Sequence, residues 1–146
     1  MDYRRMNDTF YVRIDKGEEI ISELLGICRE ENIGAAVFTG IGGCARAELQ
    51  IFIPDKGTFE TETIDGMLEL INITGNIITG DDGLYHHTHA TFSYMEGTEH
   101  KMKAGHMKAV TVRYTAEIEL RPVIGGAINR TYDPETGTGF WRFDGN

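Results

Sequence analysis

The chain has 146 residues, of which 40% are hydrophobic and 25% charged, a balance typical of a globular domain rather than a disordered or fibrous chain. Its net charge of −9, from 23 acidic against 14 basic residues, argues against a protein that binds nucleic acid through a basic surface. The polar start of the chain and the lack of an apolar run of about 18 residues favour a cytoplasmic protein without a membrane span. We expect residues 1–146 to form a single domain.

The first predicted elements are a strand at residues 9–15 and an amphipathic helix after it. The strand segment alternates between polar and apolar residues with a period of two. We expect Asp15 to be the N-cap of the helix, with Glu18 as its capping-box partner, and Asn32 and Gly34 to mark its end. The apolar face of the helix is formed by Ile20, Ile21, Leu24, Leu25, Ile27 and Cys28.

All later elements are predicted to be strands. The candidate segments are residues 34–40, 45–54, 58–64, 67–78, 85–94 and 104–120, and the tail at 137–143 is expected to add a short strand or to cover an edge. Pro54–Gly57 predicts a turn, and the long strand at 67–78 is expected to bend or bulge near Gly75. The sum is an α+β domain, with one main helix packed on an antiparallel sheet or barrel.

The histidines are concentrated in one stretch of the chain. All five lie within 21 residues, at His86, His87, His89, His100 and His106. If residues 85–94 form a strand, side chains alternate, so His87 and His89 share one face while His86 points to the other, more apolar face. A His-x-His pair on a strand can supply two ligands to one metal ion.

The position of His106 depends on the hairpin between it and His89. A two-residue type II′ turn at Gly97–Thr98 pairs Glu96 with Glu99. Counting outward from that pair places His106 directly opposite His89, on the same face. A register slip of one residue, or a longer loop, would move His106 to the other face.

In the predicted register, His87, His89 and His106 converge as three neutral imidazoles with an open fourth position. This donor set suits zinc, or another divalent transition metal. Cys44 is a further candidate ligand, although nothing in the sequence places it near the three histidines. Glu69 and Glu117 are candidate general bases only because they lie on predicted strands.

The alternative interpretation treats the histidines separately. In it, His86 lies on the core side of its strand, His100 lies in the turn, and the others are surface residues. Cys28 and Cys44 are far apart and are interpreted as reduced, mostly buried thiols.

Motifs along nearly the whole chain resemble those of the PPC (plants and prokaryotes conserved) domain family, also called domain of unknown function 296. The matching segments, in order, are VRIDKGEEIISEL, FTGIGGCARAEL, Glu69–Gly75, His87–Ala90, Ala104–His106 and Thr115–Glu117. Ala104 stands where the family has the first glycine of its Gly-Gly-His element. The hairpin between His89 and His106 is a few residues longer than is usual in the family.

The resemblance implies a PPC-like fold and a homotrimer in which these histidines can hold a metal. Plant members carry an added AT-hook, an Arg-Gly-Arg-Pro type segment, and this sequence has none. The first hypothesis is therefore a small metal-binding protein, whose role as an enzyme is left open. The second is a DNA-associated regulatory protein by analogy with the plant relatives, with weak direct nucleic-acid binding. The third is a structural oligomeric module whose histidines line a wet pocket.

Overall fold

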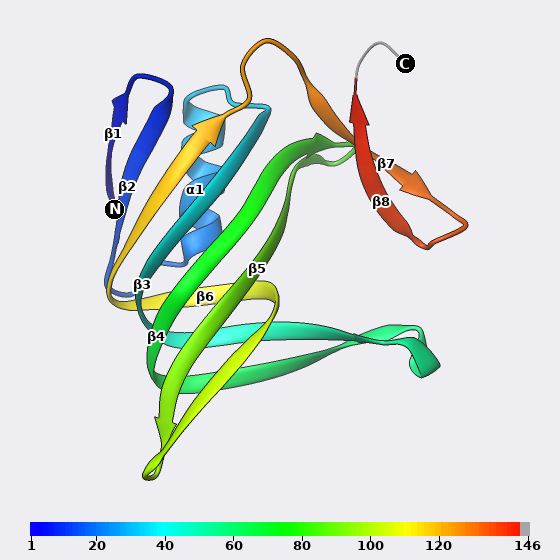
Figure 1. Cartoon of the computed structure of the whole chain (residues 1–146). Coiled ribbons are helices and arrows are strands. Elements are labelled where there is room, and N and C mark those ends of the chain that lie inside the picture. Colours follow the sequence, from blue (N-terminus) through cyan, green and yellow to red (C-terminus); the bar gives the residue numbers. More distant parts are fainter. Residues whose placement is uncertain (144–146) are drawn as a thin grey trace.

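The computed structural model describes residues 1–143, which form eight β-strands, one α-helix and a short 3-10 turn (Figure 1). The strands are β1 (Asp2–Met6), β2 (Thr9–Asp15), β3 (Ala35–Ile53), β4 (Thr58–Gly80), β5 (Gly83–Glu96), β6 (Glu99–Pro122), β7 (Ile128–Asp133) and β8 (Thr138–Phe143), and the helix α1 spans Ile20–Glu30. The α+β class is confirmed. Within residues 1–143, no helix is long and apolar enough to cross a membrane.

Several predicted strands are joined into longer ones. The segments expected at 34–40 and 45–54 belong to β3, and those expected at 58–64 and 67–78 belong to β4. The 3-10 turn Pro54–Lys56 connects the two, where the sequence predicts a turn. The β3–β4 hairpin extends away from the rest of the sheet (Figure 1). The tail does add a strand, β8, which pairs with β7 as a hairpin.

All strands belong to one sheet with the order β1-β2-β6-β3-β4-β7-β8, and β5 pairs with both β4 and β6. The pairings are antiparallel except for a parallel bridge between Thr79 of β4 and Asn129 of β7. Because β5 pairs on both sides, strands β3 to β6 close into a ring over part of their length. The flanking strands stay outside this ring, so the sheet is not the regular barrel that the sequence left as one option.

The bulge expected near Gly75 lies a few residues before it on β4. The register of β4 against β5 shifts between Leu70 and Asn72, and it is continuous through Gly75. A Cβ atom at Gly75 would lie 2.6 Å from the His87 carbonyl oxygen and 2.7 Å from Cζ of Phe38. Gly75 is therefore required for close packing of β4 against its neighbours, and not for a bulge.

The start of α1 also differs from the prediction. Glu19 is the N-cap, and its carboxylate accepts hydrogen bonds from two backbone N–H groups of the first turn at 2.7 and 3.1 Å. Asp15 cannot take this role because it is still paired within the sheet and its carboxylate binds Arg13 at 2.8 Å. Glu18 does accept from the backbone N–H of Asp15 at 2.8 Å. The predicted end is confirmed, since α1 stops at Glu30 and Asn32 has a φ of 56°.

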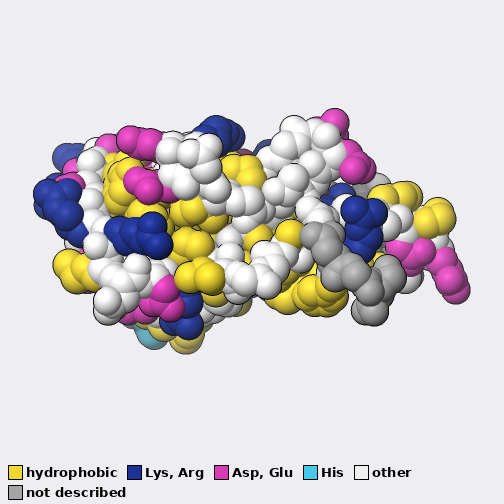
Figure 2. Space-filling model, turned by 90° about the horizontal axis from the view of Figure 1, so that it is seen from above, with side chains coloured by type: hydrophobic (Ala, Val, Ile, Leu, Met, Phe, Trp, Pro, Cys, Tyr) yellow, Lys and Arg dark blue, Asp and Glu magenta, His cyan; other side chains and the backbone are white. Residues whose placement is uncertain are grey.

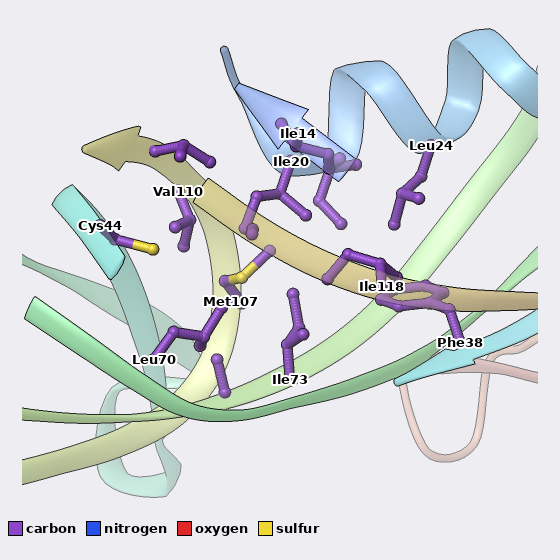
Figure 3. Packing of buried hydrophobic residues seen from close by; sticks show 14 of the residues in the cluster. Ile14, Ile20, Leu24, Phe38, Cys44, Leu70, Ile73, Met107, Val110 and Ile118 are labelled. Atoms are coloured by element: carbon purple, nitrogen blue, oxygen red, sulfur yellow. The ribbon is translucent and has the colours of Figure 1, made fainter. Parts of the chain in front are cut away.

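The core lies between α1 and one face of the sheet. Figure 3 shows Ile20 and Leu24 of the helix directed toward sheet residues that include Ile118 and Phe38. Leu24 is fully buried, and so is Cys44 at the far end of the same cluster. Both cysteines are free thiols, as predicted, and burial raises the pKa of Cys28 to about 11 and that of Cys44 to about 12. The thiolate form of each is therefore scarce at neutral pH.

Candidate metal centre

The β5–β6 hairpin has the predicted register. Glu96 pairs with Glu99 across the turn, and His89, seven residues before Glu96 on β5, pairs with His106. Gly97 has a φ of 62°, the positive value that a glycine in the first central position of a type II′ turn adopts. The turn therefore sets His106 on the same face as His89.

His87 completes the group because β6 leaves β5 just beyond that pair. At His106, β6 turns to run beside β3, where Gln50 is the partner. The ring centroids are 5.2 Å apart for His87 and His89, 5.1 Å for His87 and His106, and 5.5 Å for His89 and His106. One ring nitrogen from each histidine lies within 4.8 Å of the other two. The predicted convergence of the three rings, here called the histidine triad, is confirmed.

The surroundings favour the neutral form of two rings of the triad, His87 and His106. Burial lowers the pKa of His87, and the neighbouring His89 and the charge of Arg130 lower it further. Burial also lowers the pKa of His106, again with a contribution from the other two rings. Phe59 of the β3–β4 hairpin packs against His106 with ring centroids 5.7 Å apart. Neutral imidazoles are the form that binds a metal ion.

The donor set has the chemistry of a tetrahedral metal site. Zinc–nitrogen bonds of about 2.0–2.1 Å place ligand nitrogens about 3.3 Å apart in such a site. The triad nitrogens lie within 4.8 Å of one another, so the rings would have to move closer together to hold one ion. Three ligands leave a fourth position for water or another small ligand.

The remaining candidates from the sequence do not join the triad. His86 is hydrogen-bonded through Nδ1 to Oγ1 of the buried Thr88 at 3.1 Å. His100 contacts Ser93 near the turn, with 2.7 Å between Nε2 and Oγ. Cys44 is sealed in the core and is not part of the group.

The predicted carboxylates also lie elsewhere. Glu69 and Glu117 border a separate hollow with Gly42 and Thr115. They border neither of the two cavities that adjoin the triad. The acidic residue that does reach a triad cavity is Glu119, which the sequence did not suggest.

Two cavities adjoin the triad. One, of about 430 Å³, is bordered by His87, His89, Glu119 and Arg121 among others. The other, of about 440 Å³, is bordered by a set that includes His86, His87, His106, Lys108 and Arg130, and it is here called the Arg130 cavity. Both are large enough for a small molecule.

Asn76 and Trp141 border both cavities. Asn76 is the β4 partner of His87, and its Oδ1 accepts a hydrogen bond from Nε1 of Trp141 at 3.4 Å. The β7–β8 hairpin is thereby tied to the strand beside the triad. Strand alternation could have suggested Asn76, but nothing in the sequence places Trp141 or Arg130 near the histidines.

The sequence matches the model of the Plants and Prokaryotes Conserved (PCC) domain over residues 1–124. The β7–β8 hairpin lies beyond the matched residues. No protein of curated function matches the sequence.

Solved structures similar to this chain include a protein from Bacteroides thetaiotaomicron named as a candidate DNA-binding protein. It is 26% identical with a TM-score of 0.89, covering 98% of this chain and 97% of that one. A Pyrococcus horikoshii plant- and prokaryote-conserved protein is 27% identical, with a TM-score of 0.81 over 97% and 93% of the two chains. A metal-containing protein from Archaeoglobus fulgidus is 22% identical, with a TM-score of 0.82 over 97% and 99%. The chain belongs to the Plants and Prokaryotes Conserved domain family, abbreviated PCC or PPC.

Proposed function

We propose that this protein is a metal-binding member of the family, with one divalent transition metal ion, zinc foremost, held by His87, His89 and His106. The observation that carries the proposal is that one nitrogen from each of these rings lies within 4.8 Å of the other two. Burial also lowers the pKa of His87 and His106, which favours the neutral form that can bind a metal ion. When bound by three histidines, such an ion polarises a water or binds an anion at its open position.

The relatives add limited support. The Archaeoglobus fulgidus neighbour is called a metal-containing protein, but at 22% identity that likeness concerns the fold alone. The proposal therefore depends on the donor set of this chain. It predicts about one zinc ion per chain, because all three ligands come from one β5–β6 hairpin.

Elemental analysis of protein purified without an affinity tag tests the proposal. His87→Ala, His89→Ala and His106→Ala should each sharply weaken metal binding, since two imidazoles hold a labile ion poorly against competitors. His86→Ala is the matched control, one residue away but on the other face of β5, and should keep the metal.

His100→Ala is a second control that lies near the turn and should also keep the metal. A metal-free wild-type protein that takes up no zinc on addition would overturn the proposal. Loss of metal in His86→Ala with retention in His87→Ala would contradict the ligand assignment.

A second candidate function is association with DNA, because two of the similar structures are named as candidate DNA-binding proteins. The arrangement of the basic side chains indicates that direct binding to DNA is weak. Three lysines that lie close together in the sequence each have an acidic partner, in the pairs Lys101–Glu99, Lys103–Glu62 and Lys108–Glu48. Figure 2 shows lysine and arginine side chains lying apart from one another, between acidic and uncharged ones. A salt-dependent binding assay that gives a sub-micromolar complex at physiological salt would contradict this expectation.

We also propose that the protein is a homotrimer, as the family resemblance implies. Support comes from apolar side chains that point away from the core and are 40–62% exposed: Tyr11, Val37, Ile41, Ile71 and Tyr114. Light scattering at several concentrations should give three times the mass of the chain, and a persistent monomer would refute the trimer.

The two free thiols are in keeping with the cytoplasmic location that the sequence favours.

A further inference from the structure

The Arg130 cavity differs in charge from the rest of the chain. The sequence has 23 acidic residues, yet none of the described residues that border this cavity is an aspartate or glutamate. Its titratable side chains are instead the nitrogen bases of His86, His87, His106, Lys108 and Arg130, together with the phenol of Tyr85. A cavity of about 440 Å³ that is bordered by basic side chains and by no acidic one is suited to an anionic small molecule.

Arg130 packs against two neighbours at this cavity. Its Cζ lies 4.4 Å from the centroid of the Tyr85 ring, a cation–π contact. On another side lies Gly139, where a Cβ atom would come within 2.3 Å of Cζ and Nε of Arg130. A side chain at this position would push the guanidinium, the flexible end of Arg130, out of its present place.

The contacts of Arg130 leave its N–H donors available. Within residues 1–143, no carboxylate lies within 4.0 Å of the guanidinium, and no protein group accepts a hydrogen bond from it. Lys108, by contrast, has Glu48 at 3.4 Å. With respect to the described residues, Arg130 is therefore the main cation of the cavity without an acidic partner. A guanidinium binds carboxylate or phosphate oxygens through two parallel hydrogen bonds.

The β7–β8 hairpin brings Arg130 to the triad. Arg130 pairs across the hairpin with Trp141, and Trp141 donates to Asn76, the strand partner of His87. The charge of Arg130 also contributes to the lowered pKa of His87, so the two side chains are electrostatically coupled. Arg130, Trp141, His87 and His106 all border the same space.

We propose that the Arg130 cavity binds a small molecule that carries a carboxylate or phosphate group, with the anionic oxygens against the Arg130 guanidinium and the rest of the molecule toward His87 and His106. The inference rests on the proposed metal function in one respect, since a metal on the triad would offer the ligand a second contact at its open position. The contact with Arg130 does not need the metal.

Trp141 provides a direct reporter, because it is the only tryptophan in the chain and it borders the cavity. Zinc-loaded and metal-free protein are each titrated with oxalate and with inorganic phosphate at constant ionic strength, up to about 10 mM. Tryptophan fluorescence and isothermal titration calorimetry are followed in parallel. We expect saturable binding, and the anion that binds more tightly identifies the preferred group.

The variants separate the Arg130 contact from the metal. Arg130→Gln should weaken binding about 10-fold or more, as expected when a charge-assisted hydrogen bond is lost, with the metal content unchanged. Gly139→Ala is a second variant that displaces the guanidinium without removing it, and it should also weaken binding. Arg142→Gln is the matched control, an exposed arginine of the same hairpin that does not border the cavity, and it should bind as the wild type does.

Each outcome decides the matter. Arg130-dependent binding in both forms supports the inference, and it does so even if the protein proves to hold no metal. Binding that needs zinc and is unchanged in Arg130→Gln overturns the inference and leaves the metal proposal intact. No saturable binding of either anion to either form of the wild type also overturns it.

Discussion

The sheet has different roles in two regions of the molecule. One region is covered by α1, and the other carries the histidine triad. Under the helix, side chains such as Leu24 and Ile118 are at most 2% exposed and form a continuous apolar cluster (Figure 3). At the triad, His87 and His89 are exposed and two cavities adjoin the three rings. The first region supplies stability, and the second supplies groups that can bind a ligand.

Strand β5 contributes side chains to both regions. Thr88, Ala90 and Phe92 are at most 3% exposed, while His87 and His89 alternate with them on the other face. Because neighbouring side chains on a strand point in opposite directions, one segment can pack a core and present a site. Changes at the triad should therefore leave the fold largely intact, whereas changes under the helix should not.

The largest expected effect comes from emptying the helix–sheet contact. Leu24→Ala removes a fully buried side chain between α1 and the sheet, and we expect a loss of about 2–5 kcal/mol in the free energy of unfolding. Urea denaturation followed by circular dichroism measures it. His100→Ala, at the exposed end of the β5–β6 hairpin, should change the same quantity by less than about 0.5 kcal/mol. Equal losses in the two variants would show that the division between the regions is false.

Gly75→Ala tests the place where the two regions meet. The added Cβ would lie 2.6 Å from the His87 carbonyl oxygen and 2.8 Å from Oγ1 of Thr88. The backbone of β5 cannot move away without a cost in free energy, so we expect a destabilisation of about 1–3 kcal/mol. Because β5 must shift, zinc binding at His87 should weaken as well. Loss of stability with unchanged zinc affinity would show that the triad tolerates movement of its strand.

Glu19→Gln should have a smaller effect within the helix-covered region. The Glu19 carboxylate caps α1 and also accepts from the backbone N–H of Val110 in β6 at 3.1 Å. The amide keeps an acceptor but loses the charge at the helix N-terminus, so we expect a cost of about 1 kcal/mol. Thermal unfolding measures the change, and Glu23→Gln in the exposed first turn is the control. A cost in Glu23→Gln equal to that in Glu19→Gln would assign the effect to the helix dipole alone.

The smallest expected effect is a pH dependence that comes from the histidine end. Burial lowers the pKa of His86, His87 and His106 below the ordinary value of 6.5. Below pH 6.5 the unfolded chain therefore binds more protons than the folded one. The stability of the metal-free protein should be full above about pH 6.5, fall as pH drops toward the folded pKa values, and level off below them. Denaturation at several pH values measures this, and the triple variant His86→Ala, His87→Ala, His106→Ala should show a weaker dependence.

The sequence alone determined the features of this protein that depend on residues close together in the chain. The apolar face of α1, the strand at residues 9–15 and the Gly97–Thr98 turn follow from side-chain periods and turn geometry, which involve only near neighbours in the chain. The turn fixed the register of β5 against β6, and with it the meeting of His89 and His106. The triad could be found in this way because all three histidines lie within one hairpin.

Only the tertiary structure decided the features that join distant segments. Glu19 rather than Asp15 caps α1 because Asp15 stays paired in the sheet. The bulge of β4 lies at Leu70–Asn72, while Gly75 leaves room for Phe38. Arg130 reaches the triad only through the β7–β8 hairpin, held by Trp141. Alternation and turn length fix the order of near neighbours, whereas contacts between segments far apart depend on how the whole sheet twists and packs.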